Sequence, residues 1–112
     1  MALDKMTRLL LELVEKTNNG SLRWEGTAAE GVYQVSFPNF TVQISARGFD
    51  FVLTIRNAEG TILEEAADTE FSNKIQNPMA TMNQLYVNAR RQALGVDAAL
   101  DNLLDELSKK TS

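Results

Sequence analysis

A heptad pattern of apolar residues over positions 79–107 constrains the fold of this chain more than any other feature. Such a pattern predicts one long helix that is covered along its length. A continuous helix of this span is about 42 Å long, whereas a sheet of five strands is only about 24 Å across. We therefore expect a second copy of the chain to cover the overhang. The a and d positions are Met79, Met82, Tyr86, Ala89, Ala93, Val96, Leu100, Leu103 and Leu107.

The heptad register passes through Gly95 without a skip, although glycine costs a helix about 1 kcal/mol relative to alanine. We therefore expect a continuous or mildly kinked helix. A break at this point, with Asp97 as the N-cap of a separate helix, is the alternative. Asn77 and Pro78 suit the N-cap and the first position of the long helix.

Composition indicates one ordinary globular domain over residues 1–112, with 44% hydrophobic and 23% charged residues. The formal net charge of -4 opposes attraction to nucleic acid and to anionic membranes. Charged residues interrupt the N-terminal leucines and no stretch is long and apolar enough to cross a membrane, so we expect a cytoplasmic protein. The chain has no cysteine, so it can form no disulfide and no thiolate metal site.

The rest of the chain predicts a shorter helix followed by a meander. Residues 3–17 form the helix, with Leu3, Met6, Leu10 and Leu13 at a/d spacing, and Asn-Asn-Gly at 18–20 ends it. Over residues 21–65 the apolar period changes to two, and four turns divide the stretch into five antiparallel strands. The predicted fold class is α+β, in two layers: an N-terminal helix, a five-stranded antiparallel meander, and a long C-terminal helix that covers one sheet face.

The turns also predict the strand register. Each pairing keeps the large apolar residues on one face, because a slip of one residue would turn them into water. The predicted facing pairs are Trp24 with Tyr33, Val35 with Val42, Ile44 with Leu53, Arg47 with Asp50, and Ile55 with Leu63. The predicted apolar face is Leu22, Trp24, Tyr33, Val35, Phe37, Phe40, Val42, Ile44, Ala46, Phe51, Leu53, Ile55 and Leu63, while Phe71 and Ile75 in the connector dock on the core.

Residues that usually carry catalysis are missing. Without histidine or cysteine the chain lacks the common general base, zinc ligands and activated nucleophiles. Asp97, Asp101 and Asp105 form a row at i, i+4 and i+8, which we interpret as a solvated ridge of the long helix. We predict no catalytic, cofactor-binding or metal site, no cofactor, and no enzymatic activity.

Polar residues on the exposed sheet face suggest a second kind of surface. Arg23, Arg47 and Arg56 lie there, and we expect Arg47 to pair with Asp50 and Arg56 to lie beside Glu64. The alternative is a shallow platform for a single-stranded nucleic-acid backbone, which the acidic total charge disfavours. Phe49, at a hairpin tip, is a further candidate contact.

Several stretches resemble a group of small bacterial proteins of unassigned function. They are residues 89–101, the segment Gly-Ser-Leu-Arg-Trp at 20–24, and the hairpin at 57–60. The layout of a meander followed by one long helix is similar to the helix-swapped dimers of single-stranded nucleic-acid-binding coactivators and their Whirly-type relatives. The small, acidic, two-layered type III secretion chaperones are a weaker likeness. These resemblances imply a bacterial protein with a dimeric architecture.

The expected function is that of a non-enzymatic homodimeric interaction or adaptor module with an unidentified partner. The alternative is a single-stranded nucleic-acid-binding protein that uses the exposed sheet face. The apolar stripe of residues 3–17 is expected to pair with the C-terminal third of the long helix, within one chain or across a dimer axis. The candidate pairing residues are Leu3, Met6, Leu10, Leu13, Val96, Leu100, Leu103 and Leu107.

Overall fold

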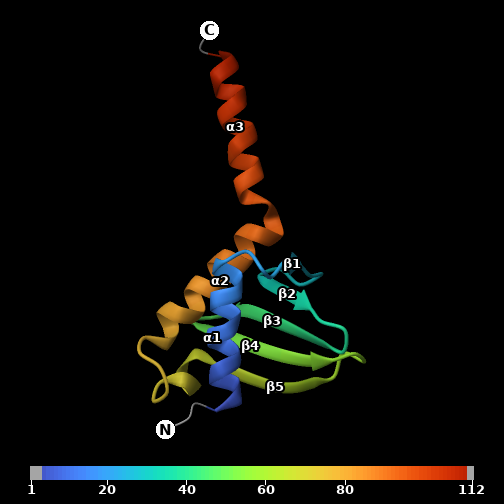
Figure 1. Ribbon diagram of the computed structural model, residues 1–112, viewed down its shortest axis with the longest axis vertical. Helices are drawn as coiled ribbons and strands as arrows, with labels where there is room; N and C mark the ends of the chain where they lie inside the picture. The colour runs from blue at the N-terminus through green and yellow to red at the C-terminus, as the bar shows by residue number, and fades with distance from the viewer. Residues whose placement is uncertain (1–3, 111–112) are drawn as a thin grey trace.

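A computed structural model describes residues 4–110 and shows an α+β fold with an open antiparallel sheet (Figure 1). The sheet strands follow the order β1-β2-β3-β4-β5, so every sheet neighbour is also a neighbour in the sequence. A narrow helix rises from one end of the wider body. The elements are α1 (Lys5–Asn18), β1 (Glu25–Gly26), β2 (Val32–Ser36), β3 (Phe40–Arg47), β4 (Asp50–Asn57), β5 (Ile62–Ala67), the 3-10 helix η1 (Asp68–Phe71), α2 (Pro78–Leu94) and α3 (Val96–Lys110).

Helix α1 begins and ends at residues whose chemistry suits those positions. The Asp4 side chain caps it by accepting a 2.8 Å hydrogen bond from the Thr7 backbone N–H. At the other end Gly20 adopts φ 80°, and the Ser21 N–H donates back to the Lys16 carbonyl across 2.9 Å. The predicted helix over residues 3–17 is confirmed to within one or two residues, and Leu3 lies outside the described residues.

The two central hairpins have the register that their turns predicted. Val35 faces Val42, Ile44 faces Leu53, and Arg47 faces Asp50. Gly48 has φ 61° and Phe49 does not have a positive φ, as a type II′ turn requires. The turn therefore sets the pairing of β3 with β4 along eight residues of each strand.

The first hairpin is shifted by two residues from the prediction. Gly26 faces Tyr33 and Glu25 faces Gln34, so the predicted pair of Trp24 with Tyr33 is wrong. The loop therefore spans residues 27–32 instead of the predicted 26–31, and the Thr27 hydroxyl donates to the Val32 carbonyl across its base at 2.9 Å. Because the shift is even, Trp24 stays on the core face and is buried.

The last hairpin departs from the prediction by one residue. Gly60 has φ 85° and its N–H donates to the Asn57 carbonyl, so the turn itself is confirmed, and it places Arg56 opposite Ile62. A bulge then makes Glu64, and not Leu63, the partner of Ile55. The predicted core position of Leu63 is therefore wrong, and Ala66 is buried instead.

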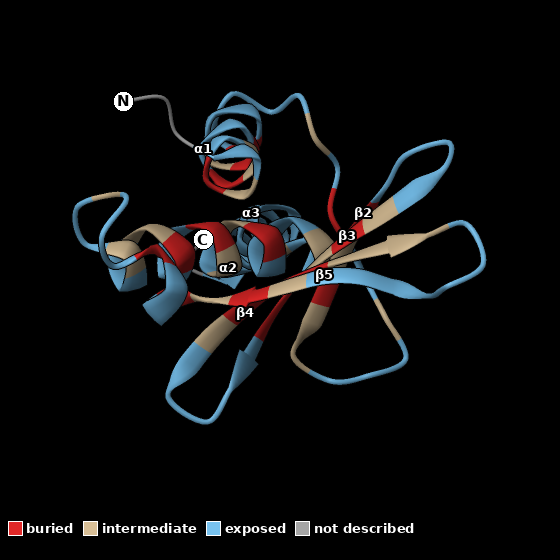
Figure 2. Cartoon of the chain, turned by 90° about the horizontal axis from the view of Figure 1, so that it is seen from below, coloured by how far each residue is buried: buried red, intermediate tan, exposed pale blue. Residues whose placement is uncertain are grey.

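Helix α2 lies between the sheet and α1, so the molecule has a third layer (Figure 2). Its residues Met82, Leu85 and Ala89 are fully buried, while α1 contributes Leu10 and Leu13 to the same core. The predicted docking of Phe71 and Ile75 is confirmed, since Phe71 is buried in the core and Ile75, partly buried, packs against the same core. Both helices lie on the same side of the sheet, as predicted, with α2 against the strands and α1 against α2.

The prediction of one continuous helix over residues 79–107 is wrong. Helix α2 ends at Leu94, Gly95 takes the left-handed conformation with φ 64°, and α3 starts at Val96. The alternative is right about the break but not about its cap, because the Gly95 carbonyl, and not that of Asp97, accepts the first helical hydrogen bond from Ala99. Helix α3 does not fold back on the body but projects away from it (Figure 1).

Candidate functional site

Helix α3 presents an uncovered apolar stripe, and this stripe is the leading candidate for a functional surface. Not one of its residues between Val96 and Lys110 is buried. We define the leucine stripe as Leu100, Leu103, Leu104 and Leu107, whose exposed fractions are 46%, 58%, 64% and 62%. Leucines with this exposure on one helix face are typical of a surface that a partner covers.

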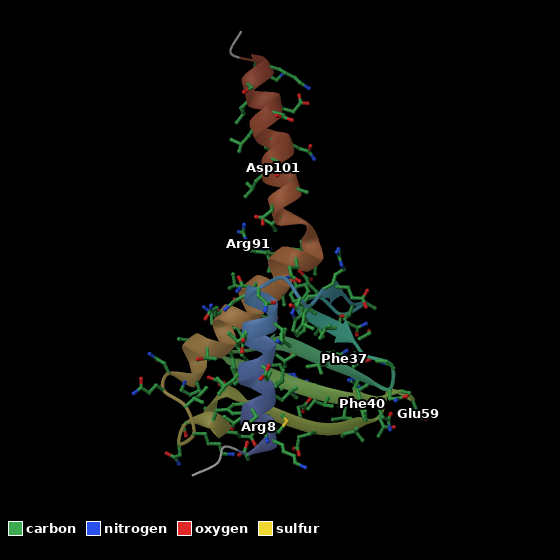
Figure 3. All side chains as sticks on the ribbon, in the orientation of Figure 1. Arg8, Phe37, Phe40, Glu59, Arg91 and Asp101 are labelled. Carbon is green, nitrogen blue, oxygen red and sulfur yellow. The ribbon has the colours of Figure 1, made fainter. Side chains whose placement is uncertain are left out.

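The stripe projects from the body because the chain changes direction at Gly95, the single residue between α2 and α3. The Gly95 N–H donates to the Gln92 carbonyl while the Gly95 carbonyl accepts from the Ala99 N–H, so this glycine ends α2 and starts α3. Arg91 and Asp97 form an ion pair of 2.6 Å across the junction. In Figure 3 Arg91 lies at the junction and Asp101 lies on α3 well above the body.

The predicted pairing of the α1 stripe with the C-terminal third of the long helix does not occur within the chain. Leu10 and Leu13 are buried in the body's core, and Met6 packs against the same core. Helix α1 meets α2, not the leucine stripe. The α1 residues that were predicted to cover Leu100, Leu103 and Leu107 are therefore packed in the core of the body. Of the two predicted pairing faces, only the one on α3 is exposed.

The acidic row on α3 lies outside the a and d positions of the heptad. Asp97 pairs with Arg91, and Asp101 and Asp105 are exposed. Within residues 4–110 no group of three or more acidic or other ligating side chains could hold a metal ion. The exposure of Asp101 and Asp105 fits the interpretation of a solvated ridge.

The arginines of the exposed sheet face make contacts different from those predicted. Arg47 pairs with Glu65 at 2.9 Å, and not with Asp50. This contact holds the pKa of Glu65 below its usual range, and a hydrogen bond from the Thr54 hydroxyl is the second largest cause. The bulge at Leu63 explains the exchange of partners. It places Glu65 opposite Thr54, and therefore on the same face of the sheet as Arg47.

Arg56 is held within the sheet as well. Its Nε donates to Gln43 Oε1 across 3.1 Å, and its Nη1 donates to the Gly60 carbonyl across 2.8 Å, so the expected position beside Glu64 is wrong. Gln43 in turn donates to Gln34. The guanidinium groups of Arg47 and Arg56 thus bond to other residues of the sheet. Arg23 is exposed near the end of α1, and Phe49 is 95% exposed at its hairpin tip. The nucleic-acid hypothesis stays a prediction.

A second exposed apolar group lies at the far end of the sheet and was missed by the sequence reasoning. Phe37 and Phe40 were predicted to be buried but are 42% and 48% exposed. Figure 3 shows them at the same end as Glu59, beyond the span of α1 and α2. Their alternation with polar residues identified the correct face, but the helices do not reach the ends of these strands.

Comparison of the chain with protein-family models, with characterised proteins and with solved structures finds no match. The resemblances to small bacterial proteins, to Whirly-type dimers and to secretion chaperones therefore stay predictions. Between residues 4 and 110 no helix is both long and apolar enough to cross a membrane. The geometry of the chain's own surfaces is the basis for a functional proposal.

Proposed function

We propose that this chain is a non-enzymatic interaction module that forms a homodimer through α3. The observation that supports the proposal is the leucine stripe, which contacts no part of the chain's own core although its spacing is that of a packed helix seam. Fully burying a leucine contributes about 1.5 to 3 kcal/mol. An assembly that buries the leucine stripe is therefore stabilised by that burial.

A second copy of the chain is the occupant that best fits the stripe. A heptad seam is self-complementary, because the same a and d positions supply knobs and holes on both helices. The α1 stripe is already in use within the core. Between Val96 and Leu107 the polar residues of α3 lie outside the a and d positions, as they do in a two-stranded coiled coil. In the dimer, α3 would hold two sheet domains together and leave their exposed surfaces free for a further partner.

Sedimentation of a charged variant tests the proposal. We expect the wild type to be a dimer at micromolar concentration and Leu100→Asp with Leu103→Asp to be a monomer, because two carboxylates would be desolvated in the seam. The body should stay folded, since α3 contributes nothing to its core. The single tryptophan, Trp24, is buried in the body, and its fluorescence reports on that fold.

A matched control places the same charges on the opposite side of α3. Ala98 and Asn102 are exposed and lie about half a turn from the seam at 100° per residue. Ala98→Asp with Asn102→Asp should therefore remain a dimer. A wild type that is monomeric at about 100 μM, or a stripe variant that is still dimeric, would contradict the proposal.

A further inference from the structure

The heptad positions of α3 favour one alignment of two antiparallel helices. In an antiparallel pair, an a residue of one helix lies beside a d residue of the other. Helix α3 has Leu100 and Leu107 at a, and Val96 and Leu103 at d. Placing Val96 beside Leu107 also places Leu100 beside Leu103, so all four layers are apolar. A shift by one heptad in one direction would place charged Lys110 against Leu100. In the other direction it would place Leu107 beside Ala89, which is buried in the body.

The body rules out the parallel alternative by its bulk. Figure 2 looks along the long axis and shows α3 inside the outline of the body, not at its edge. The molecule measures 34 × 28 Å across this axis, whereas paired helices are only about 8–10 Å apart. Two parallel α3 helices would require both bodies to occupy the same space. An antiparallel pair places the bodies at opposite ends.

Electrostatics favours the same orientation. Antiparallel helices oppose their macrodipoles, whereas parallel helices align them. The last turn of α3 carries Lys109 and Lys110, and the first turn carries Asp97. The antiparallel alignment brings the basic C-terminal end of one α3 beside the acidic N-terminal end of the other. The parallel alignment instead places Lys110 of one copy beside Lys110 of the other.

We infer that two copies of the chain pair their α3 helices antiparallel, with Val96 of each beside Leu107 of the other. The inference rests on the proposed function, because it requires the α3 dimer. It makes the assembly an elongated rod with one sheet domain at each end. The exposed ends of the two sheets, with Phe37 and Phe40, are then far apart and cannot contact one target site together.

Cysteine cross-linking tests the orientation, and the natural chain has no cysteine to interfere. Val96→Cys and Leu107→Cys are made separately, and each is oxidised alone and after mixing with the other. A disulfide needs Cα atoms about 4.4–6.8 Å apart. In the antiparallel pair, residues 96 of the two copies lie roughly 16 Å apart along the axis. We expect the mixture to give at least about fivefold more cross-linked dimer than either variant alone.

The outcomes separate the orientation from the existence of the dimer. Efficient cross-linking of each variant with itself, in a protein that sediments as a dimer, would overturn the antiparallel alignment and leave the proposed function standing. A monomer by sedimentation would overturn both. Small-angle scattering of the unmodified protein gives an independent readout. We expect a maximum dimension of about 100 Å, because two chains of 60 Å overlap only along the roughly 22 Å of α3.

Discussion

The indole N–H of Trp24 donates a 2.9 Å hydrogen bond to the hydroxyl oxygen of Thr17, and both side chains are buried. The backbone N–H of Trp24 also donates to Gln92 of α2 across 3.1 Å. One residue just before β1 is thereby joined to the last turn of α1 and to α2. This contact fixes how the two helices sit on the first strand of the sheet.

Removing the Thr17 hydroxyl should destabilise the domain. Thr17→Val keeps the shape of the side chain and its helix propensity but leaves the buried indole N–H without an acceptor, at a cost of about 1–3 kcal/mol in the free energy of unfolding. Thr7→Val is the matched control on the same buried face of α1, because the Thr7 hydroxyl accepts no hydrogen bond from the indole N–H or from another described helix or strand. Denaturant unfolding of both variants should show a clearly smaller loss at Thr7.

Valine at Gly48 should also destabilise the domain. Gly48 has φ 61°, which a β-branched residue adopts at a cost of more than about 1 kcal/mol. Gly26 in β1 provides the control, since it has no positive φ and a Cβ there would meet no atom within 4 Å. The urea midpoint should fall for Gly48→Val and stay level or rise for Gly26→Val. Equal midpoints for the two variants would contradict the type II′ assignment.

Alanine at Gly95 should change the shape of the molecule and not its fold. The left-handed conformation costs alanine about 1 kcal/mol or more, whereas alanine is the best residue for a continuous helix. Gly95→Ala should therefore straighten the junction of α2 and α3, while Gly95→Asn, which tolerates the left-handed region, should not. Distances between spin labels on the two helices measure the angle. An unchanged distance in Gly95→Ala would mean that the Arg91 and Asp97 pair holds the bend.

Acid should weaken the domain through Glu65 and Asp4. The pKa of Asp4 is lowered to about 2, first by Lys74 and then by the Thr7 backbone N–H, and that of Glu65 is lowered by Arg47 and Thr54. A carboxylate with a lowered pKa stabilises the fold above its ordinary value, and this stabilisation is lost as the pH falls through the lower folded value.

The free energy of unfolding should therefore decline as the pH falls from about 5 toward 2. Glu65→Gln should flatten the upper part of that decline, because it removes the titrating group that Arg47 holds. Glu64→Gln removes the same charge from the adjacent residue, whose side chain points to the other face of β5. If both variants gave the same pH profile, the Arg47 contact would not be the cause.

The order of the elements and most of the sheet register could be predicted because local chemistry determines them. Pro38-Asn39 and Gly48-Phe49 each allow one tight turn, and the turn sets the pairing for a whole strand. The bulge at Leu63 was not predicted, because Ile62 and Leu63 are adjacent apolar residues followed by two glutamates, and this stretch has no alternation that fixes the register. It lets Glu65 meet Arg47 and Ala66 enter the core, and both are tertiary contacts.

The candidate surface could be predicted only in part. Spacing identified Leu100, Leu103 and Leu107 as residues that need a cover, but the same spacing runs through Gly95, so it concealed the junction. Heptad periodicity describes side-chain positions and not backbone continuity. Leu10 and Leu13 fit the same periodic pattern, and only the position of α2 shows that the core already covers them.

The two edges of the sheet limit how molecules of this chain can join. Strand β5 ends the sheet on one side, where the bulge at Leu63 and the charges of Glu64 and Glu65 interrupt the regular row of backbone donors and acceptors. On the other side β1 is only two residues long. Short, bulged or charged edges resist the addition of a foreign strand. These edges therefore disfavour growth into fibrils through the sheet, and association through a helix does not depend on either edge.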